Sequence, residues 1–412
     1  MTNPAKSPSF LLLLAALSAI PGMSIDIVLP ALPSIAAEIG VSTRQAQMTI
    51  SAFLVGAAMG QLAIGPLADR YGRRPIIIAG LTIYVLAAFG ALCTTSATAL
   101  MLFRFIQGAG VATGFVLTRA IVRDLFDNRE ASRILSKIMI AVSTAALAAP
   151  MIGAALVVAA EWRAVFGLLA LGGGLLLVVV AIFLPESISK RDSDALRPRK
   201  IIGNYRRFFR TRICFGYAAV NACLYGGLLA YLSGSPFVMV SGVGQVSEPT
   251  FGSLLAVTAL ALMVGAAANG YLVKRFSPQG LIGVGILLLA GVSVAMLASA
   301  WLAKGSVGAP AVLSLVLPMA VYSVAIGLVV PNATAIGMKP VSDMAGSAAS
   351  VMLSLQALVG AATGYLVNLA HDGTPTSIAV VVAGCCFAAA STYWLVLCGQ
   401  SDASETRVAA AA

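Results

Sequence analysis

The fold is decided by the stretch GPLADRYGRRP, residues 65–75, which lies between two long apolar runs. Gly65 lets another helix, the eleventh of the spans counted below, approach closely. Asp69 can cap or face a helix N-terminus, where negative charge is favoured, and Gly72 permits a tight turn. The stretch also holds three arginines, which favour the inner side of a membrane: Arg70, Arg73 and Arg74. It predicts a short charged turn between two membrane-spanning helices.

The composition excludes a surface that faces water. Of the 412 residues, 59% are hydrophobic and 10% are charged, whereas a soluble domain carries roughly 25% charged residues. A transmembrane helix needs about 20 apolar residues, and continuous Leu, Ala, Val and Ile runs supply them along the chain. A β-barrel is excluded because its strands alternate polar and apolar residues. We therefore predict an all-α membrane protein.

Charges, Gly/Pro clusters and loop signals separate the apolar runs into twelve predicted transmembrane helices. Their ranges are 10–33, 46–66, 76–95, 99–122, 134–158, 164–184, 213–236, 250–272, 280–302, 310–336, 344–369 and 376–398. The stretch 270–278 is a weaker copy of 65–75 at the same place in the second half. This repeat predicts two pseudo-symmetric six-helix bundles, residues 1–187 and 213–412, around a basic linker, residues 188–212.

Basic residues predict the orientation. The loops after even-numbered helices and the tails hold most of them, including Lys6, Arg70, Arg191 and Arg275, while the opposite loops hold little beyond Arg44, Arg163 and Lys304. By the positive-inside rule both termini are cytoplasmic, in a multi-pass protein of the bacterial inner membrane. This rule also explains the net charge of +11 without nucleic acid as a partner.

The predicted linker carries nine basic residues from Lys190 to Arg212. One interpretation is a solvated segment held at the anionic membrane surface. The other is a regulatory or partner-binding role. The six cysteines lie in or beside apolar runs without metal spacing, so we interpret them as packing residues and expect no metal site.

Three motifs carry a resemblance to a known family. The stretch 65–75 resembles the signature loop of the major facilitator superfamily (MFS), and Leu102–Gly110 resembles the helix-4 motif of its proton-driven members. Ala149–Ala154 matches the helix-5 exporter motif at Pro150 and Gly153, lacks the Gly before the Pro, and has Ala154 where a second Gly is usual.

Shorter segments are similar to one branch of that family, the twelve-span drug:proton antiporters of bicyclomycin and chloramphenicol resistance (Bcr/CflA). These segments are Asp26–Pro33, Arg119–Asp124, Trp162–Phe166, Leu184–Ser187 and Ala345–Ser350. The resemblance implies the MFS fold, alternating access, a proton gradient in place of a cofactor, and a functional monomer.

Asp26 is the only acidic residue clearly inside a predicted span, and such a residue is a functional hypothesis by default. Arg104 lies at a similar depth, roughly 10 Å below the outer surface at 1.5 Å per residue. We predict that the two form a pair whose separation changes the proton affinity of Asp26, and the resemblance assigns both motif positions to proton coupling. The alternative is a permanent structural pair between helices 1 and 4.

A second set of charges lies near the inner ends of helices 2 and 4. The resemblance implies a cytoplasmic charge network that holds the two halves together when the outside is open. Its candidate residues are Gly65, Asp69, Arg70, Gly72, Arg73, Arg119, Arg123 and Asp124. Ordinary positive-inside charge explains Arg123 equally well, whereas Arg119 lies a turn inside the span.

The resemblance places the substrate between the halves, mainly on helices 1, 4, 7 and 10. Candidate lining residues are polar or aromatic: Met23, Thr113, Asn221, Tyr225, Tyr231, Tyr322, Asn332 and Gln356. Each of them can instead face another helix, because polar residues in spans often join helices. With so few charges we expect a small neutral or weakly charged amphipathic substrate.

Other function classes lack their motifs. The only histidine is His371, and the sequence has no HExxH, no Gly-x-Ser-x-Gly and no phosphate-binding Gly-x-x-x-x-Gly-Lys-Ser/Thr, so an enzyme and an ATP-driven pump are not favoured. A channel would need a repeated filter or rings of charge. The prediction is a proton-coupled exporter of drugs, with a proton-coupled uptake symporter or a facilitator for a small metabolite as the alternative.

Overall fold

The structure, a computed structural model, describes residues 8–126, 128–188, 191–302, 305–370 and 373–397. The predicted orientation residues Lys6, Lys190 and Lys304, together with His371 and Cys398, lie outside the described residues.

Twelve helices are long and apolar enough to cross a membrane, as predicted. The first bundle contains α1 (Pro8–Asp26), η2 (Leu29–Ala31), α2 (Leu32–Ile39), α3 (Thr43–Tyr71), α4 (Arg73–Cys93), α5 (Ala97–Leu125), α6 (Asn128–Ala160) and α7 (Arg163–Phe183). The second contains α9 (Arg212–Met239), α10 (Glu248–Leu272), α11 (Pro278–Leu302), α12 (Ala309–Met338), η3 (Lys339–Met344), α13 (Ala345–Leu369), α14 (Thr376–Thr392) and η4 (Tyr393–Leu397). The described part of the chain is all helix and connections, which confirms the predicted fold class.

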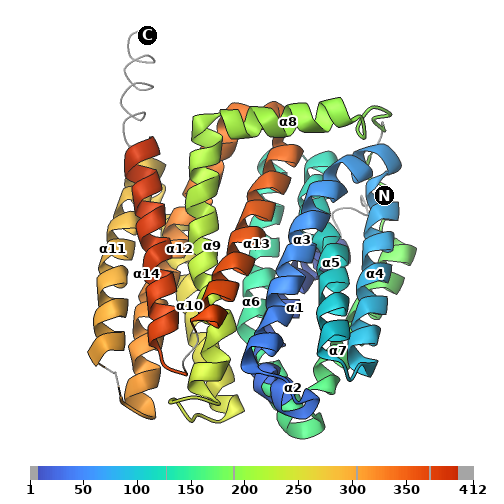
Figure 1. Ribbon diagram of the computed structural model, residues 1–412. Helices are drawn as coiled ribbons and strands as arrows, with labels where there is room; N and C mark the ends of the chain where they lie inside the picture. Colours follow the sequence, from blue (N-terminus) through green and yellow to red (C-terminus); the bar gives the residue numbers. More distant parts are fainter. Residues whose placement is uncertain (1–7, 127, 189–190, 303–304, 371–372, 398–412) are drawn as a thin grey trace.

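The two bundles stand side by side, and α8 (Pro198–Arg210) lies across one end of them (Figure 1). Two helix pairs form most of the seam between the bundles: α3 packs against α13, and α6 packs against α10. Glycine brings the second pair together, since a Cβ atom on Gly252 of α10 would lie 3.0 Å from the Pro150 carbonyl oxygen of α6. The site described below lies beside this seam.

The first span is broken, whereas the sequence predicted one helix over 10–33. α1 ends at Asp26, and the chain continues through the short 3₁₀ turn η2 into α2. The Val28 N–H bonds to the Ile25 carbonyl three residues back, which tightens the last turn. Pro30 has no N–H to donate to the carbonyl four residues back, so α-helical hydrogen bonding cannot continue across it, and the break follows from local sequence.

The predicted linker is partly helical. Its residues 198–210 form α8, which was predicted as a loop. Phe208 of α8 is fully buried, and the Tyr205 hydroxyl donates to the Leu62 carbonyl of α3 at 2.8 Å. On the other bundle, the Asn204 amide donates to the Ser347 hydroxyl of α13 at 3.3 Å. α8 therefore contacts both bundles. Its hydrophobic contacts, spaced along the basic segment, stabilise the helix.

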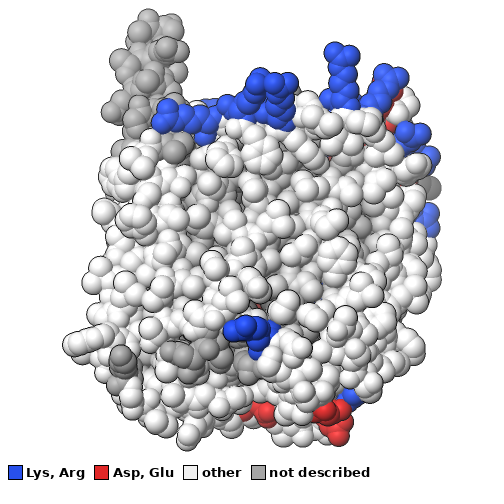
Figure 2. Space-filling model, in the orientation of Figure 1, with Lys and Arg blue, Asp and Glu red and all other residues white. Residues whose placement is uncertain are grey.

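Charge divides the molecule into two ends. Lys and Arg side chains gather at the end that carries α8, and acidic side chains are visible at the opposite end (Figure 2). On the face that Figure 2 shows, most of the surface between the ends is uncharged, apart from one basic group nearer the end opposite α8, as expected of a surface that faces lipid. We refer to the end with α8 as the basic end.

Candidate functional site

Asp26 lies at the end of an accessible stripe on α1. Leu12, Ala16, Met23 and Asp26 follow one another at helical spacing on one face, and Leu12, near the basic end, is 71% exposed. Gly22, one turn before Asp26, has open space where a side chain would stand. The face is uncovered because α1 packs against α5 and α6 through its other sides.

The residues directly after Asp26 are buried. Ile27, Val28, Leu29, Ala31 and Leu32 are all 0% exposed, and η2 contacts α6, α9 and α10. Gly153 allows this packing, because a Cβ atom on Gly153 of α6 would overlap the Ile27 carbonyl oxygen. The accessible surface of α1 therefore runs from the basic end to Asp26 and stops there.

Arg104 of α5 is completely buried beside the same turn of α1. Its guanidinium donates to Gln107 Oε1 at 2.6 Å and to the Ser24 carbonyl oxygen at 3.0 Å. It also lies over the Phe53 ring, 4.3 Å from the ring centroid. Buried charges need such partners, so the Arg104 side chain is fixed in place.

The predicted contact between Asp26 and Arg104 is not formed. Among the described residues, the Asp26 carboxylate has no ion pair and no hydrogen bond. The reason is helix geometry: Ser24, whose hydroxyl bonds the Tyr84 hydroxyl at 2.8 Å, faces α4 and α5, and a residue two positions later points about 200° away around the axis. Equal depth therefore did not bring the two side chains together.

Arg104 instead holds the end of α1. In a continuous helix the Ser24 carbonyl would accept from the Val28 N–H, but that N–H bonds to Ile25. The break thus leaves the Ser24 carbonyl free for the guanidinium, at a helix C-terminus where positive charge is favoured. Arg104 of α5 therefore contacts the turn that carries Asp26 through the backbone of α1, and not through the Asp26 side chain.

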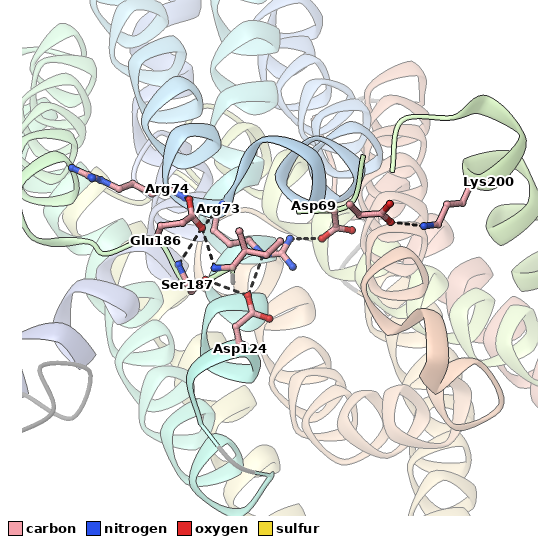
Figure 3. A network of polar contacts seen from close by, with 9 residues as sticks. Asp69, Arg73, Arg74, Asp124, Glu186, Ser187 and Lys200 are labelled. Atoms are coloured by element: carbon pink, nitrogen blue, oxygen red, sulfur yellow. Dashed lines mark hydrogen bonds and ion pairs between the residues drawn. The ribbon is translucent and has the colours of Figure 1, made fainter. Parts of the chain in front are cut away.

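The charge network at the basic end is centred on Arg73 (Figure 3). Its guanidinium contacts Asp69 Oδ1 at 2.7 Å and Asp124 Oδ2 at 3.3 Å. Asp124 also accepts from the Ser187 hydroxyl at 3.2 Å. These contacts join the turn between α3 and α4 to the ends of α5 and α7 within the first bundle. The network continues to α8, because the Asp192 N–H donates to the Asp69 carbonyl at 3.0 Å and Lys200 of α8 pairs with Asp192.

Glu186 is a network residue that the sequence reasoning missed. Its carboxylate accepts from the backbone N–H groups of Arg73 at 2.9 Å and Arg74 at 3.3 Å, at the first turn of α4. Negative charge is favoured there. Gly72 precedes this turn with φ 108°, where a side chain would be strained and would overlap the Glu186 carboxylate. The available signal was the position of Glu186 directly after the end of α7.

Four other predicted network residues lie apart from Arg73. Arg70 is exposed and lies over the Tyr71 ring, and Arg123 is exposed at the end of α5. Arg119 stacks on Phe115, 4.3 Å from the ring centroid. A Cβ atom on Gly65 would lie 3.4 Å from Ser350 Oγ of α13, which is an ordinary contact. The eleventh span, α13, is therefore near Gly65 as predicted, but this position does not require glycine.

Of the eight predicted lining residues, four are bonded or packed against neighbouring helices. The Asn221 amide donates to Thr334 Oγ1 at 3.0 Å, and the Asn332 amide donates to Asn269 Oδ1 at 2.6 Å. The Tyr322 hydroxyl donates to the Leu224 carbonyl at 2.7 Å. Thr113 packs against Gly80 of α4. These four join helices, the alternative that the sequence left open.

The other four differ in exposure. Met23 and Tyr225 are partly exposed, and Gln356 is 9% exposed. Tyr231 is fully buried, and its hydroxyl has no hydrogen-bond partner within the described ranges. Met23 lies on the accessible stripe of α1. Of these residues it is the one next to Asp26.

The bundles are bonded to each other at the end opposite α8. The Gln47 amide of α3 donates to the Ser233 carbonyl of α9 at 3.1 Å, and the Asn368 amide of α13 donates to the Arg44 carbonyl of α3 at 2.8 Å. Together with the buried residues 27–32, these bonds close that end. The seam between the bundles is therefore held closed at the end opposite α8 in this structure.

Comparisons with known proteins agree with one another. The family model described as Major Facilitator Superfamily matches residues 13–364. The bicyclomycin resistance protein homolog of Haemophilus influenzae is 28% identical and covers 94% of this chain and 96% of its own length. Multidrug resistance protein D of Escherichia coli is 30% identical, covering 85% and 86%.

A solved structure shows the same fold. The xylose transporter XylE of E. coli, in a partially occluded inward open conformation, superposes with a TM-score of 0.74 at 15% sequence identity, and the match covers 94% of this chain and 97% of XylE.

Proposed function

Because the chain belongs to the Major Facilitator Superfamily, we propose that it exports small amphipathic compounds from the cell in exchange for protons. It is a multi-pass membrane transporter and not an enzyme. Its relatives include proteins named for resistance to bicyclomycin and to multiple drugs, which supports drug efflux as the direction and the substrate class.

The observation that carries the proposal is the state of Asp26. It is an acidic residue inside a span, partly exposed, and without an ionic partner among the residues that the structure describes. A carboxylate at membrane depth is energetically costly, so its presence there indicates a function by default. An unpaired and reachable carboxylate is able to take up and release a proton, whereas a permanently paired one is not.

In the proposed cycle the face of α1 that carries Asp26 is open first to one end of the molecule and then to the other. In one state of the proposed cycle Asp26 is reached from the basic end. We propose that the basic end faces the cytoplasm, as Lys/Arg placement favours. Here Asp26 releases a proton and substrate binds. When the contacts of Gln47, Asn368 and residues 27–32 open, substrate leaves outward and Asp26 is protonated. Arg104 moves with α1 because it is bonded to the Ser24 carbonyl.

The proposal has three further features. The chain works as a monomer in the bacterial inner membrane, with both termini in the cytoplasm. The proton gradient supplies the energy, so no cofactor is required. The partners are the substrate, protons and the lipid bilayer.

The test is proton flux in inside-out membrane vesicles with an acidic interior. Neutral antibiotics, chloramphenicol among them, are added one at a time. Wild-type protein should release protons with at least one compound, and Asp26→Asn should abolish this while being inserted in equal amount. Full activity of Asp26→Asn would contradict the proposal. Proton movement in the same direction as the substrate would instead establish the uptake symporter.

A further inference from the structure

Arg119 is a cation inside a span, and no carboxylate of the described part of the chain pairs with it. It lies six residues before the end of α5, about 9 Å along the axis from that end. Its guanidinium stacks on Phe115, and no ion pair or hydrogen bond joins it to any residue that the structure describes. A cation at this depth marks a functional site by default.

The nearby carboxylates are engaged elsewhere. Asp124 and Asp69 both bond to Arg73. Asp124 is also five residues after Arg119 on the same helix, which places it about 140° around the axis. Among the residues that the structure describes, no carboxylate therefore serves as a counterion for Arg119.

A second polar group approaches Arg119 from the other bundle. Tyr225 of α9 is partly exposed, its hydroxyl has no hydrogen-bond partner within the described chain, and it lies within range of an electrostatic interaction with the Arg119 guanidinium. Helical side chains tilt toward the helix N-terminus, so Arg119 leans away from the basic end and deeper between the bundles.

The position agrees with the accessible stripe of α1. Thr118, the residue before Arg119, bonds to the Leu14 carbonyl of α1 at 3.5 Å. Arg119 is therefore level with the part of α1 next to Leu12, which is 71% exposed. A molecule that enters from the basic end along this stripe passes Arg119 before it reaches Asp26.

We propose that Arg119 and Tyr225 bind the negatively charged group of an amphipathic organic monoanion, such as a carboxylate. The guanidinium supplies the charge and planar N–H donors, the Tyr225 hydroxyl adds one donor from the other bundle, and Phe115 provides an apolar surface for the body of the ligand. A site with a single cation favours a ligand with a single negative charge. This inference rests on the proposed function, since it names a substrate class for the same transporter.

The test is binding to the purified full-length protein in detergent, without a proton gradient. Nalidixate and its uncharged methyl ester are compared by equilibrium dialysis at pH 7.5. Charge-assisted hydrogen bonds contribute about 1.5–3 kcal/mol, so wild type should prefer nalidixate by about tenfold or more. Arg119→Gln should remove the preference, and Tyr225→Phe should lower it several-fold.

Three controls keep the result specific. Unchanged binding of the methyl ester shows that Arg119→Gln is folded. Arg123→Gln, one turn further on and exposed, should keep the preference. Asp26→Asn should also keep it while losing gradient-driven transport, which separates failure of this inference from failure of the proposed function. A wild type that does not prefer nalidixate, or an Arg119→Gln variant that still does, overturns the inference.

Discussion

Arg104 donates a hydrogen bond of 3.0 Å to the carbonyl oxygen of Ser24, two residues before Asp26 ends α1. This bond joins α5 to the one turn of α1 that carries the acidic residue. Because the contact is to the backbone, protonation of Asp26 does not break it. Arg104 is therefore a positioning residue: it fixes where the helix ends and so where the carboxylate stands.

The first prediction concerns Arg104→Lys. An ammonium keeps the charge but lacks the planar fork that reaches both Ser24 and Gln107. Each lost charge-assisted bond costs about 1.5–3 kcal/mol, so both the melting temperature in detergent and gradient-driven export should fall, the latter by at least about tenfold. Arg199→Lys, on the exposed side of α8, is the matched control and should behave as wild type. Retained stability and export in Arg104→Lys would contradict the positioning role.

A second prediction compares two glycines. A Cβ atom on Gly153 would overlap the Ile27 carbonyl, whereas one on Gly172 of α7 meets nothing within 4 Å. Gly153→Ala should lose about 1–3 kcal/mol through overpacking and reduce export. Gly172→Ala should be neutral or slightly stabilising, since Ala favours helix by about 1 kcal/mol. Thermal unfolding of both variants measures the difference, and equal behaviour would show that α6 does not need this close approach.

The third prediction concerns the cap of α4. Glu186→Ala removes the acceptor for the Arg73 and Arg74 backbone N–H groups. Loss of such a cap costs about 1 kcal/mol, so the melting temperature should fall by a few degrees. Glu186→Gln keeps an acceptor without the charge and should fall between wild type and Glu186→Ala. If both variants melt as wild type, the carboxylate does not stabilise this turn.

A fourth prediction uses pH to test how α8 is held. Burial raises the pKa of Tyr205 above its ordinary value of 10.0, so the folded protein keeps this proton longer than the unfolded chain. The stabilisation is therefore complete below pH 10 and declines as pH rises further, because a phenolate cannot donate to the Leu62 carbonyl. Wild type should melt above Tyr205→Phe at pH 8, and the difference should shrink as the pH rises above 10. A difference independent of pH would assign it to packing alone.

Much of the fold was predictable because it depends on local composition. Long apolar runs must become helices in a bilayer, where each backbone group needs a partner within its own segment. Gly72 and the arginines around it likewise identified the turn between α3 and α4. Pro30 indicated the break after α1, but the sequence analysis predicted one continuous helix because the apolar pattern continues through Pro30. α8 was overlooked because a charged segment between bundles resembles a loop.

The sequence by itself determined the twelve spans, the basic end and Asp26 as the one acidic residue clearly inside a span, because each depends on which residue types a bilayer tolerates at which depth. Only the tertiary structure decided which groups meet. In the structure Asp26 faces away from Arg104, Arg104 donates to the Ser24 carbonyl, Glu186 joins the charge network, and Arg119 has no ion pair with any described residue. The reason is that depth along a helix can be counted from sequence, whereas the direction in which a side chain points depends on the rotation and packing of helices far apart in the chain.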